Sequence, residues 1–493
     1  MIKRLHQFRR WAGVDRSVFF SNAAQMMRLV TGPVTMALVL RYLTPEIQGY
    51  FYAFSGVVAM QVFLEMGFSQ NILQFASHEF ARLHFTAAQT LAGDSAAKSR
   101  LISLGRLAFG YYAVAALLVL FAIGIGGHIF FTMSEHHEVA HQGAAAVGNA
   151  VLAAKSMPGH PVVAWRGAWW IIAVTAALSL AINPAWALLE GCNQVAVIAQ
   201  FRFWAGLASF TVNALALIAG AGIYASAIGS FCNLLICLGY LGWRWKSFFL
   251  QFLERPRHGQ VSWAREIWPF QWRIAVSWMS GYFIFDIINP IAFYFCGPVE
   301  AGRLGMSFQL IRMVYGVAIT WVSTKAPRFG MLIAARTWRE LDSLWRRSTL
   351  QAFIICLLGM GSMLAAIPIV GHLLPKVPAR LAPFGVNAWL GGAMLVQILI
   401  SSMAMELRAH KREPYMWLSV ANAILSVAFI LPLVRVWGIY GEAMGYALAI
   451  LAVLIPSHKI YRMKRLEYRR HADASHEPTS TILEIAPSSG GFP

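Results

Sequence analysis

The chain has 493 residues, of which 58% are hydrophobic and only 12% are charged. This composition excludes an ordinary soluble domain and favours a membrane protein. Lysine and arginine outnumber aspartate and glutamate by 40 to 21. We expect no nucleic-acid partner, because the basic residues lie between apolar stretches, where they set membrane topology and meet anionic lipid headgroups.

Twelve apolar stretches follow one another along the chain. A helix needs about 20 mostly apolar residues to cross a hydrocarbon core of about 30 Å. Most of the stretches approach this length, so the sequence predicts an all-α polytopic membrane protein. The expected spans are 18–40, 48–73, 105–131, 167–190, 200–220, 222–243, 268–295, 301–324, 348–373, 386–406, 414–435 and 437–457.

The segments between the spans carry very unequal numbers of basic residues. The segments on one side of the membrane hold 29 of the 40 lysine and arginine residues, and the segments on the other side hold 7. The remaining four lie within or at the ends of spans. Because basic loops stay in the cytoplasm, we expect a multi-pass protein of the bacterial inner (cytoplasmic) membrane with both termini inside. No cleavage site follows the basic N-terminus, so we expect the first span to be retained. The basic segments are 1–17, 76–104, 191–202, 244–267, 325–347, 407–413 and 458–493.

The spans divide into two groups of six around the basic segment 244–267. Because six is even, both groups enter the membrane from the same side, as parallel repeats do. We therefore predict an N-terminal six-helix lobe at 1–243 and a C-terminal six-helix lobe at 244–460. Residues 461–493 are predicted to form a cytoplasmic tail, disordered where its apolar period is lost.

A short turn signature recurs in the two halves. Pro45 and Gly49 lie between the first two spans, and Pro298 and Gly302 lie between spans seven and eight. Proline and glycine at this spacing are typical of a tight turn. The recurrence, 253 residues apart, supports the two-repeat interpretation.

Polar residues inside the spans are the main candidates for function, because a charge in hydrocarbon is expensive unless it faces water or a partner. In spans one, two, seven and eight these residues recur at helical spacing, which indicates faces turned toward the bundle interior. They are Asn22, Gln25 and Arg28 in span one, Glu65 in span two, Arg273, Asp286 and Asn289 in span seven, and Gln309 and Arg312 in span eight.

The segment from Arg41 to Tyr50, which contains the run Leu-Thr-Pro-Glu-Ile-Gln-Gly, and the Glu-Met-Gly run at 65–67 carry a resemblance. The chain resembles the polysaccharide and O-antigen flippases, relatives of the multidrug and toxin extrusion (MATE) transporters and of the lipid II flippase. The motifs cover about residues 15–80, and the second half carries only the Pro-Gly turn. The resemblance implies two lobes forming a V around a central cavity and movement of a lipid-linked oligosaccharide or polysaccharide precursor from the inner to the outer leaflet.

In this interpretation Arg28, Arg273 and Arg312 offer guanidinium groups to a pyrophosphate-linked sugar headgroup, because the planar fork binds phosphate oxygens in pairs. Asn22, Gln25 and Gln309 would line the same basic cavity. The alternative is structural: Arg28 pairs with Glu65, and Arg273 or Arg312 pairs with Asp286, as buried ion pairs.

Glu65 and Asp286 are also candidates for coupling transport to a proton or another cation. Asp286 is the better one, because a helix break at Asn289–Pro290 would free carbonyl groups beside it. Gly32, Pro33 and Pro290 are candidate hinges for alternating access, the alternative being kinks that only accommodate a neighbouring helix.

We expect no cofactor and no metal ion. His136, His137 and His141 lie together but have no compelling third ligand. A MATE-type antiporter of drugs or small molecules is the nearest alternative function, and a membrane glycan-modifying enzyme is a more distant one, since no paired-carboxylate motif is present. The expected partners are a lipid-pyrophosphate-linked saccharide, membrane lipid and polysaccharide assembly proteins.

Overall fold

The computed structural model describes residues 16–136, 163–256, 260–373, 377–410 and 413–474. These residues are almost entirely helical. Eight continuous helical stretches within them are long and apolar enough to cross a membrane, and the longest of these fold back on themselves at interior breaks.

The first half of the chain forms one bundle. Its elements are α2 (Arg16–Tyr42), α3 (Pro45–Val58), η1 (Ala59–Gln61), α4 (Val62–Glu65), α5 (Phe68–Phe80), β1 (Leu83–Phe85), β2 (Leu91–Gly93), α6 (Ser95–Leu118), η2 (Val119–Ile125), α8 (Trp165–Ala181), α9 (Asn183–Leu189), η4 (Glu190–Gln194), α10 (Val195–Ile218) and α11 (Tyr224–Arg244). Around this N-terminal lobe neighbouring helices contact in the order α2, α10, α11, α8, α6, α5.

The second half forms the other bundle, after a short connecting segment. The connecting segment holds α12 (Lys246–Leu250) and η5 (Gln251–Leu253), which contact α11 and α6 of the N-terminal lobe, and then η6 (Trp263–Ile267). The C-terminal bundle consists of α13 (Trp268–Phe285), α14 (Ile288–Ser323), α15 (Ala326–Ala334), α16 (Trp338–Leu373), η7 (Pro378–Arg380), α17 (Phe384–Ala409) and α18 (Met416–Ala474). Within this C-terminal lobe α14 contacts α16, α17 and α18, while α13 contacts α18.

Local chemistry explains where several helices begin. Thr44 caps α3 by accepting a hydrogen bond from the Ile47 amide, and Pro45 occupies the first turn, where its missing N–H is harmless. Asp94 caps α6 through the amides of Ala96 and Ala97. Long apolar runs then continue each helix, because all backbone groups must be satisfied within the segment that spans the bilayer.

Five residues with positive φ mark breaks in the long helical stretches, and one of them, Asn193 (φ 62°), interrupts the stretch Trp165–Ile218. Met66 and Gly67 (φ 49° and 65°) separate α4 from α5, so the predicted span 48–73 is not one continuous helix. Gly297 divides α14 and Gly438 divides α18, which produces the turns predicted between spans seven and eight and between spans eleven and twelve.

Three features differ from the sequence-based expectation or extend it. Helix α18 continues to Ala474, past the predicted lobe boundary at 460. A small antiparallel hairpin joins α5 to α6 by pairing Leu83 with Gly93 and Phe85 with Leu91. The outer segment 132–166 is described only at its ends, so two of the three clustered histidines, at positions 137 and 141, lie outside the described residues.

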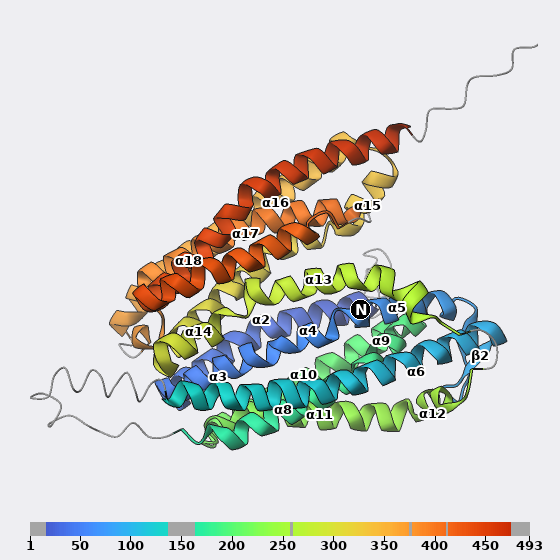
Figure 1. Cartoon of the computed structure of the whole chain (residues 1–493), viewed down its shortest axis with the longest axis horizontal. Coiled ribbons are helices and arrows are strands. Elements are labelled where there is room, and N and C mark those ends of the chain that lie inside the picture. Colours follow the sequence, from blue (N-terminus) through green and yellow to red (C-terminus); the bar gives the residue numbers. More distant parts are fainter. Residues whose placement is uncertain (1–15, 137–162, 257–259, 374–376, 411–412, 475–493) are drawn as a thin grey trace, which may run out of the picture.

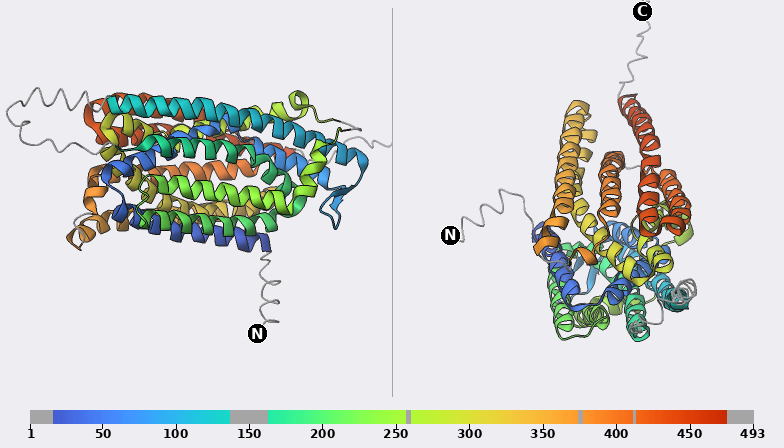
Figure 2. Two further views of the ribbon diagram at one scale, coloured as in Figure 1. Left: turned by 90° about the horizontal axis from the view of Figure 1, so that it is seen from below. Right: turned by 90° about the vertical axis from the view of Figure 1, so that its left-hand side faces the viewer.

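The two lobes lie together at one end and diverge toward the other (Figure 1). The end at which they meet carries the starts of α3 and α8 and the middle of α14. The diverging end carries the start of α2 and the end of α18. The two further views show the helices of each lobe running roughly parallel to one long axis (Figure 2). This confirms the predicted architecture of two helical lobes.

Candidate functional site

The two Pro-Gly turns found in the sequence meet each other where the lobes converge. A Cβ added at Gly49 would lie 1.9 Å from the carbonyl oxygen of Pro298, and one added at Gly302 would lie 2.9 Å from the amide nitrogen of Gly49. Only glycine permits backbones to approach this closely. The repeat signature therefore forms the closest contact between α3 and α14.

A buried glutamine joins the lobes at the same place. The Gln48 side chain is 1% exposed and donates a hydrogen bond of 2.8 Å to the Gly302 carbonyl. It also exchanges hydrogen bonds of 3.2 Å with Arg380, whose guanidinium donates to the Leu43 carbonyl as well. Desolvation by burial lowers the pKa of Arg380 from its ordinary value. Sequence reasoning missed both residues, because Gln48 was not part of a polar stripe and Arg380 lay in a loop.

Helix α13 contacts both lobes. Near its start, Gln271 hydrogen-bonds the side chain of Asn71 and donates a hydrogen bond of 2.6 Å to the Met66 carbonyl. The break at Gly67 lies against Ile274 and Trp278 of the same helix. Farther along, α13 lines a cavity of the C-terminal lobe, so it lies between the two bundles where they diverge.

The structure brings Arg312 and Asp286 together. Arg312 Nη1 lies 2.8 Å from Asp286 Oδ1 and also donates to the Phe285 carbonyl at 3.2 Å. The guanidinium lies over the rings of Phe285 and Phe308. The two charged side chains are 43% and 32% exposed. The ion pair is therefore accessible rather than sealed in the core, and the other N–H groups of Arg312 have no acceptor within the described part of the chain.

The predicted helix break lies beside this ion pair. Helix α13 ends at Phe285 and α14 begins at Ile288, so Pro290 occupies the first turn of α14. Pro290 has no N–H and leaves the Asp286 carbonyl without its helical donor. The ring of Pro290 packs against Gly56 of α3. The break lies at Asp286–Ile287, a few residues before the predicted position at Asn289–Pro290, and the role of Pro290 as a hinge stays a prediction.

Glu65 lies inside the N-terminal lobe, at the end of α4. It accepts hydrogen bonds of 2.9 Å from Ser69 and from Asn183. These neutral donors stabilise a carboxylate without cancelling its charge. The proposed pairing of Glu65 with Arg28 is not tested, because the side chain of Arg28 lies outside the described residues.

The side chains of Asn22 and Gln25 also lie outside the described residues, although their backbone lies in α2. Helix α2 stays continuous through the exposed Pro33. At Gly32 it contacts α14, because a Cβ there would lie 1.8 Å from Met313 Cε. Positions 25, 28 and 32 share one face of a helix, so the polar face predicted for α2 includes the position that contacts the opposite lobe.

The two remaining candidates lie on the facing helices but apart from the ion pair. Arg273 is exposed on α13 beside the ring of Trp272. Gln309 is half-buried on α14, one turn before Arg312. Neither side chain forms a hydrogen bond with a described residue, and their predicted roles in substrate binding are untested.

A mainly apolar cavity of about 320 Å³ with several polar side chains at its wall lies inside the C-terminal lobe, between α13, α14, α17 and α18. Tyr315 and Ser401 share a hydrogen bond of 2.8 Å at its wall, and Gln397 donates to Ser401. The side-chain oxygens of Gln397 and Asn422 are buried without a partner in the described residues. Such groups require water or a bound polar group. No cluster of three metal-ligating side chains occurs in the described part of the chain.

No family model and no curated protein matches the chain. Among solved structures, the lipid II flippase MurJ in an inward closed conformation aligns with a TM-score of 0.58 at 11% identity, over 95% of this chain and 94% of that one. An inward-facing multidrug resistance MATE family transporter of the MOP superfamily aligns with a TM-score of 0.49 at 14% identity, over 89% of this chain and 96% of that one. The chain thus has the fold of MurJ, which confirms the predicted fold class and the flippase resemblance at the level of fold.

Proposed function

We propose that this protein is a flippase that moves a lipid-linked saccharide across the cytoplasmic membrane by alternating access. The observation that carries the proposal is an accessible ion pair in a MurJ-like fold. Arg312 on α14 pairs with Asp286 at the end of α13. The pair is accessible, and the guanidinium donors of Arg312 that the described residues do not engage can bind an anionic headgroup.

The substrate would enter between the lobes from their diverging end. Its phosphate groups would accept hydrogen bonds from Arg312, and Arg28 and Arg273 would add positive charge on α2 and α13. The saccharide hydroxyls would bond Asn22, Gln25 and Gln309. Separation of the Gly49 and Pro298 backbones would then open the other end, with Gly32, Pro33 and Pro290 as the positions that absorb the change of angle.

The charge asymmetry supports an orientation with both chain ends in the cytoplasm. Reporter fusions after residues 190 and 243 should both report the cytoplasm, and a fusion after residue 150 should report the outside. A C-terminal fusion that reports the outside would contradict the even number of spans. Under the proposed orientation, the diverging end opens to the cytoplasm.

The test of the proposed function uses the full chain in proteoliposomes with a fluorescent isoprenoid-pyrophosphate oligosaccharide. Arg312→Ala should lower the flipping rate about tenfold or more, because a hydrogen bond to a charged group contributes about 1.5–3 kcal/mol. Arg312→Lys should restore it only partly. Arg435→Ala is the matched control, since Arg435 is also exposed but stacks on Phe295 and not on the rings that Arg312 covers. Normal flipping by Arg312→Ala at native abundance would refute the proposed binding role.

Cation coupling is tested separately by Asp286→Asn and Glu65→Gln under an imposed proton or sodium gradient. We propose that Asp286 is the coupling carboxylate, because it is 32% exposed and adjoins the break before Pro290. Its neutralisation should remove the gradient dependence while the protein still accumulates. Equal gradient stimulation in wild type and Asp286→Asn would exclude this residue.

A MATE-type antiporter is the second candidate function. The accessible Asp286 carboxylate is the observation that favours it, since a cationic drug would replace Arg312 as the partner of that carboxylate. Transport of a lipophilic cation that is lost in Asp286→Asn, together with no flipping of the lipid-linked oligosaccharide, would support the antiporter over the flippase.

A further inference from the structure

A groove lies on the outside of the C-terminal lobe, apart from the interface between the lobes. It is formed by two adjoining hollows of about 870 Å³ and 560 Å³ that share Trp345, Thr349 and Leu399. Helices α16 and α18 form its walls and α17 its floor. Figure 1 shows α16 and the last part of α18 on the side of this lobe that is turned away from the N-terminal lobe. In a membrane this face meets lipid.

The lining of the groove is basic at one end and apolar at the other, and this holds for the residues of α16 and for those of α18. On α16, Arg346 precedes Phe353 by seven residues, and on α18, Arg462 follows Ile455 by seven. At 1.5 Å per residue each change spans about 10 Å. Because the two helices run in opposite directions, their cations lie at one end of the groove, toward the end of α18, and their apolar residues lie deeper.

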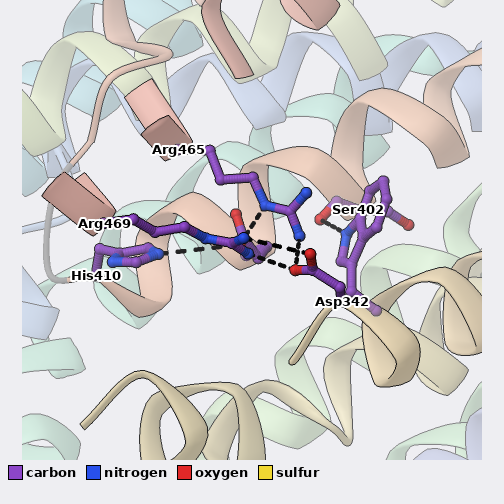
Figure 3. A network of polar contacts seen from close by, with 7 residues as sticks. Asp342, Ser402, His410, Arg465 and Arg469 are labelled. Carbon is purple, nitrogen blue, oxygen red and sulfur yellow. Dashed lines mark hydrogen bonds and ion pairs between the residues drawn. The ribbon is translucent and has the colours of Figure 1, made fainter. Parts of the chain in front are cut away.

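The cations of the groove have no ion-pair partners of their own. They are Arg339, Arg346, Arg347, Lys459 and Arg462, all exposed, and none of them forms an ion pair with another described residue. The acid that lines the groove, Asp342, is already bound by Arg465 and Arg469 (Figure 3). Arg465 also lies 3.3 Å from the buried Glu406. The groove therefore keeps an uncompensated positive charge.

A buried hydroxyl points to a ligand independently of this charge. Thr349 is 8% exposed, and its Oγ1 has no hydrogen-bond partner among the described residues. It lines both hollows, between the basic end and the apolar end. An unpaired buried hydroxyl is unfavourable unless a bound group or water satisfies it.

We propose that the groove between α16, α17 and α18 binds an anionic phospholipid. Its headgroup phosphate lies among Arg346, Lys459 and Arg462 and accepts a hydrogen bond from Thr349. Its acyl chains run along Leu350 and Phe353. A soluble anion would use only the basic half, whereas a lipid uses both halves at the depth at which a bilayer supplies them. The site holds a lipid as a structural ligand and is separate from the transport pathway between the lobes.

The test compares the full-length protein purified in micelles doped with phosphatidylglycerol or with phosphatidylcholine, and native mass spectrometry counts the lipids retained. Wild type should retain phosphatidylglycerol preferentially. Each basic residue near an anionic lipid contributes about a fivefold preference, so Arg346→Ala/Lys459→Ala should lose about tenfold or more of this retention. The matched control is Arg244→Ala/Lys246→Ala, an exposed pair at the junction of α11 and α12 beside the other lobe, which should retain the lipid.

Three results would overturn the proposal. One is equal retention of the two lipids by wild type, and another is the same loss in both double variants, which would mean general surface charge. The third is glycerol phosphate binding as tightly as phosphatidylglycerol, which would mean a site for a soluble anion. Thr349→Val preserves side-chain volume and all cations, and it should lower retention several-fold. If the Arg346→Ala/Lys459→Ala variant does not accumulate, Thr349→Val serves as the test instead. Unchanged retention of phosphatidylglycerol by Thr349→Val would then overturn the proposal.

Discussion

The two ends of the interface between the lobes are stabilised by different interactions. Where the lobes meet, uncharged backbone contacts at Gly49 and Gly302 dominate, together with the buried side chain of Gln48. Where they diverge, ion pairs satisfy charges locally: Arg100 binds Glu79 and Glu266, and Asp342 binds two arginines of its own lobe. The closed end is held by close packing and hydrogen bonds, whereas ion pairs lie at the open end, where Arg100 on α6 also binds Glu266 in the segment before α13.

This difference has a consequence for alternating access. Opening the closed end requires loss of close packing and a few hydrogen bonds, including those of the Arg380 guanidinium, but breaks no ion pair among the described residues. Contacts of this kind act over a short range, so a small displacement releases them. Substitutions at the closed end should therefore have larger effects than substitutions at the open end.

Gly49→Val should have the largest effect. Its Cβ would lie 1.9 Å from a backbone oxygen that cannot move away like a flexible side chain, so the substitution should destabilise the closed end by about 3 kcal/mol or more. Cysteine cross-linking across α3 and α14 should then fall sharply. Gly316→Ala on α14 is the control, because a Cβ at that position meets nothing within 4 Å. Unchanged cross-linking in Gly49→Val would show that the contact does not hold the lobes together.

Gln48→Leu should have the next largest effect. It leaves the Gly302 carbonyl and the Arg380 guanidinium without their buried partner, which costs about 1–3 kcal/mol. The population with the closed end open should increase, as measured by distances between spin labels on the two lobes. Ser55→Ala, on the exposed side of α3, should leave the distances unchanged. A distance distribution for Gln48→Leu identical to that of wild type would show that Gln48 does not hold the lobes together at the closed end.

Asp342→Ala tests the open end. It removes the partner that Arg465 and Arg469 share between α16 and α18. Because Asp342 is 35% exposed, water compensates in part and the loss of unfolding free energy should be about 1–2 kcal/mol. Thermal unfolding in detergent measures it, with the neighbouring exposed Glu340→Ala as control. The closed-end cross-links should persist; their loss would show that the two ends are not independent.

Glu266→Gln should give the smallest and a pH-dependent effect. The Ser262 amide, and then Arg100, lower the pKa of Glu266 from its ordinary value. A lowered folded-state pKa adds stability that is present above the unfolded-state pKa and is lost as pH falls through the folded-state pKa. The melting temperatures of wild type and variant should therefore differ at pH 7 and converge below about pH 4. A difference that persists at acidic pH would mean that the stabilisation does not come from the carboxylate. Glu254→Gln, at an exposed position nearby, serves as the control.

Much of the fold followed from the hydrophobic pattern. Apolar runs of the length of a bilayer, separated by basic loops, predicted the spans and the two-lobe organisation because the membrane leaves few alternatives to a helix. The paired Pro-Gly turns supported the two repeats, but only the structure shows that they contact each other. The break at Met66, by contrast, was not visible, because a non-glycine residue with positive φ has no simple signature in one sequence.

The candidate site was predicted only in part. The sequence placed Arg312 and Asp286 on facing helices and left open which arginine Asp286 would meet. Their separation of 26 residues across a helix break cannot be converted into a distance without the turn geometry. Gln48 and Arg380 are 332 residues apart, and no periodic pattern relates them.

The sequence by itself determined the class of protein, the positions of the charges within the apolar stretches and a helix break before Pro290, because each depends on local composition and the demands of the bilayer. Only the tertiary structure decided which charges pair, that Gln48 and Arg380 together join the lobes, and that the cations of α16 and α18 gather in one groove. These are relations between residues far apart in the chain, and they arise from packing, which a single sequence does not specify.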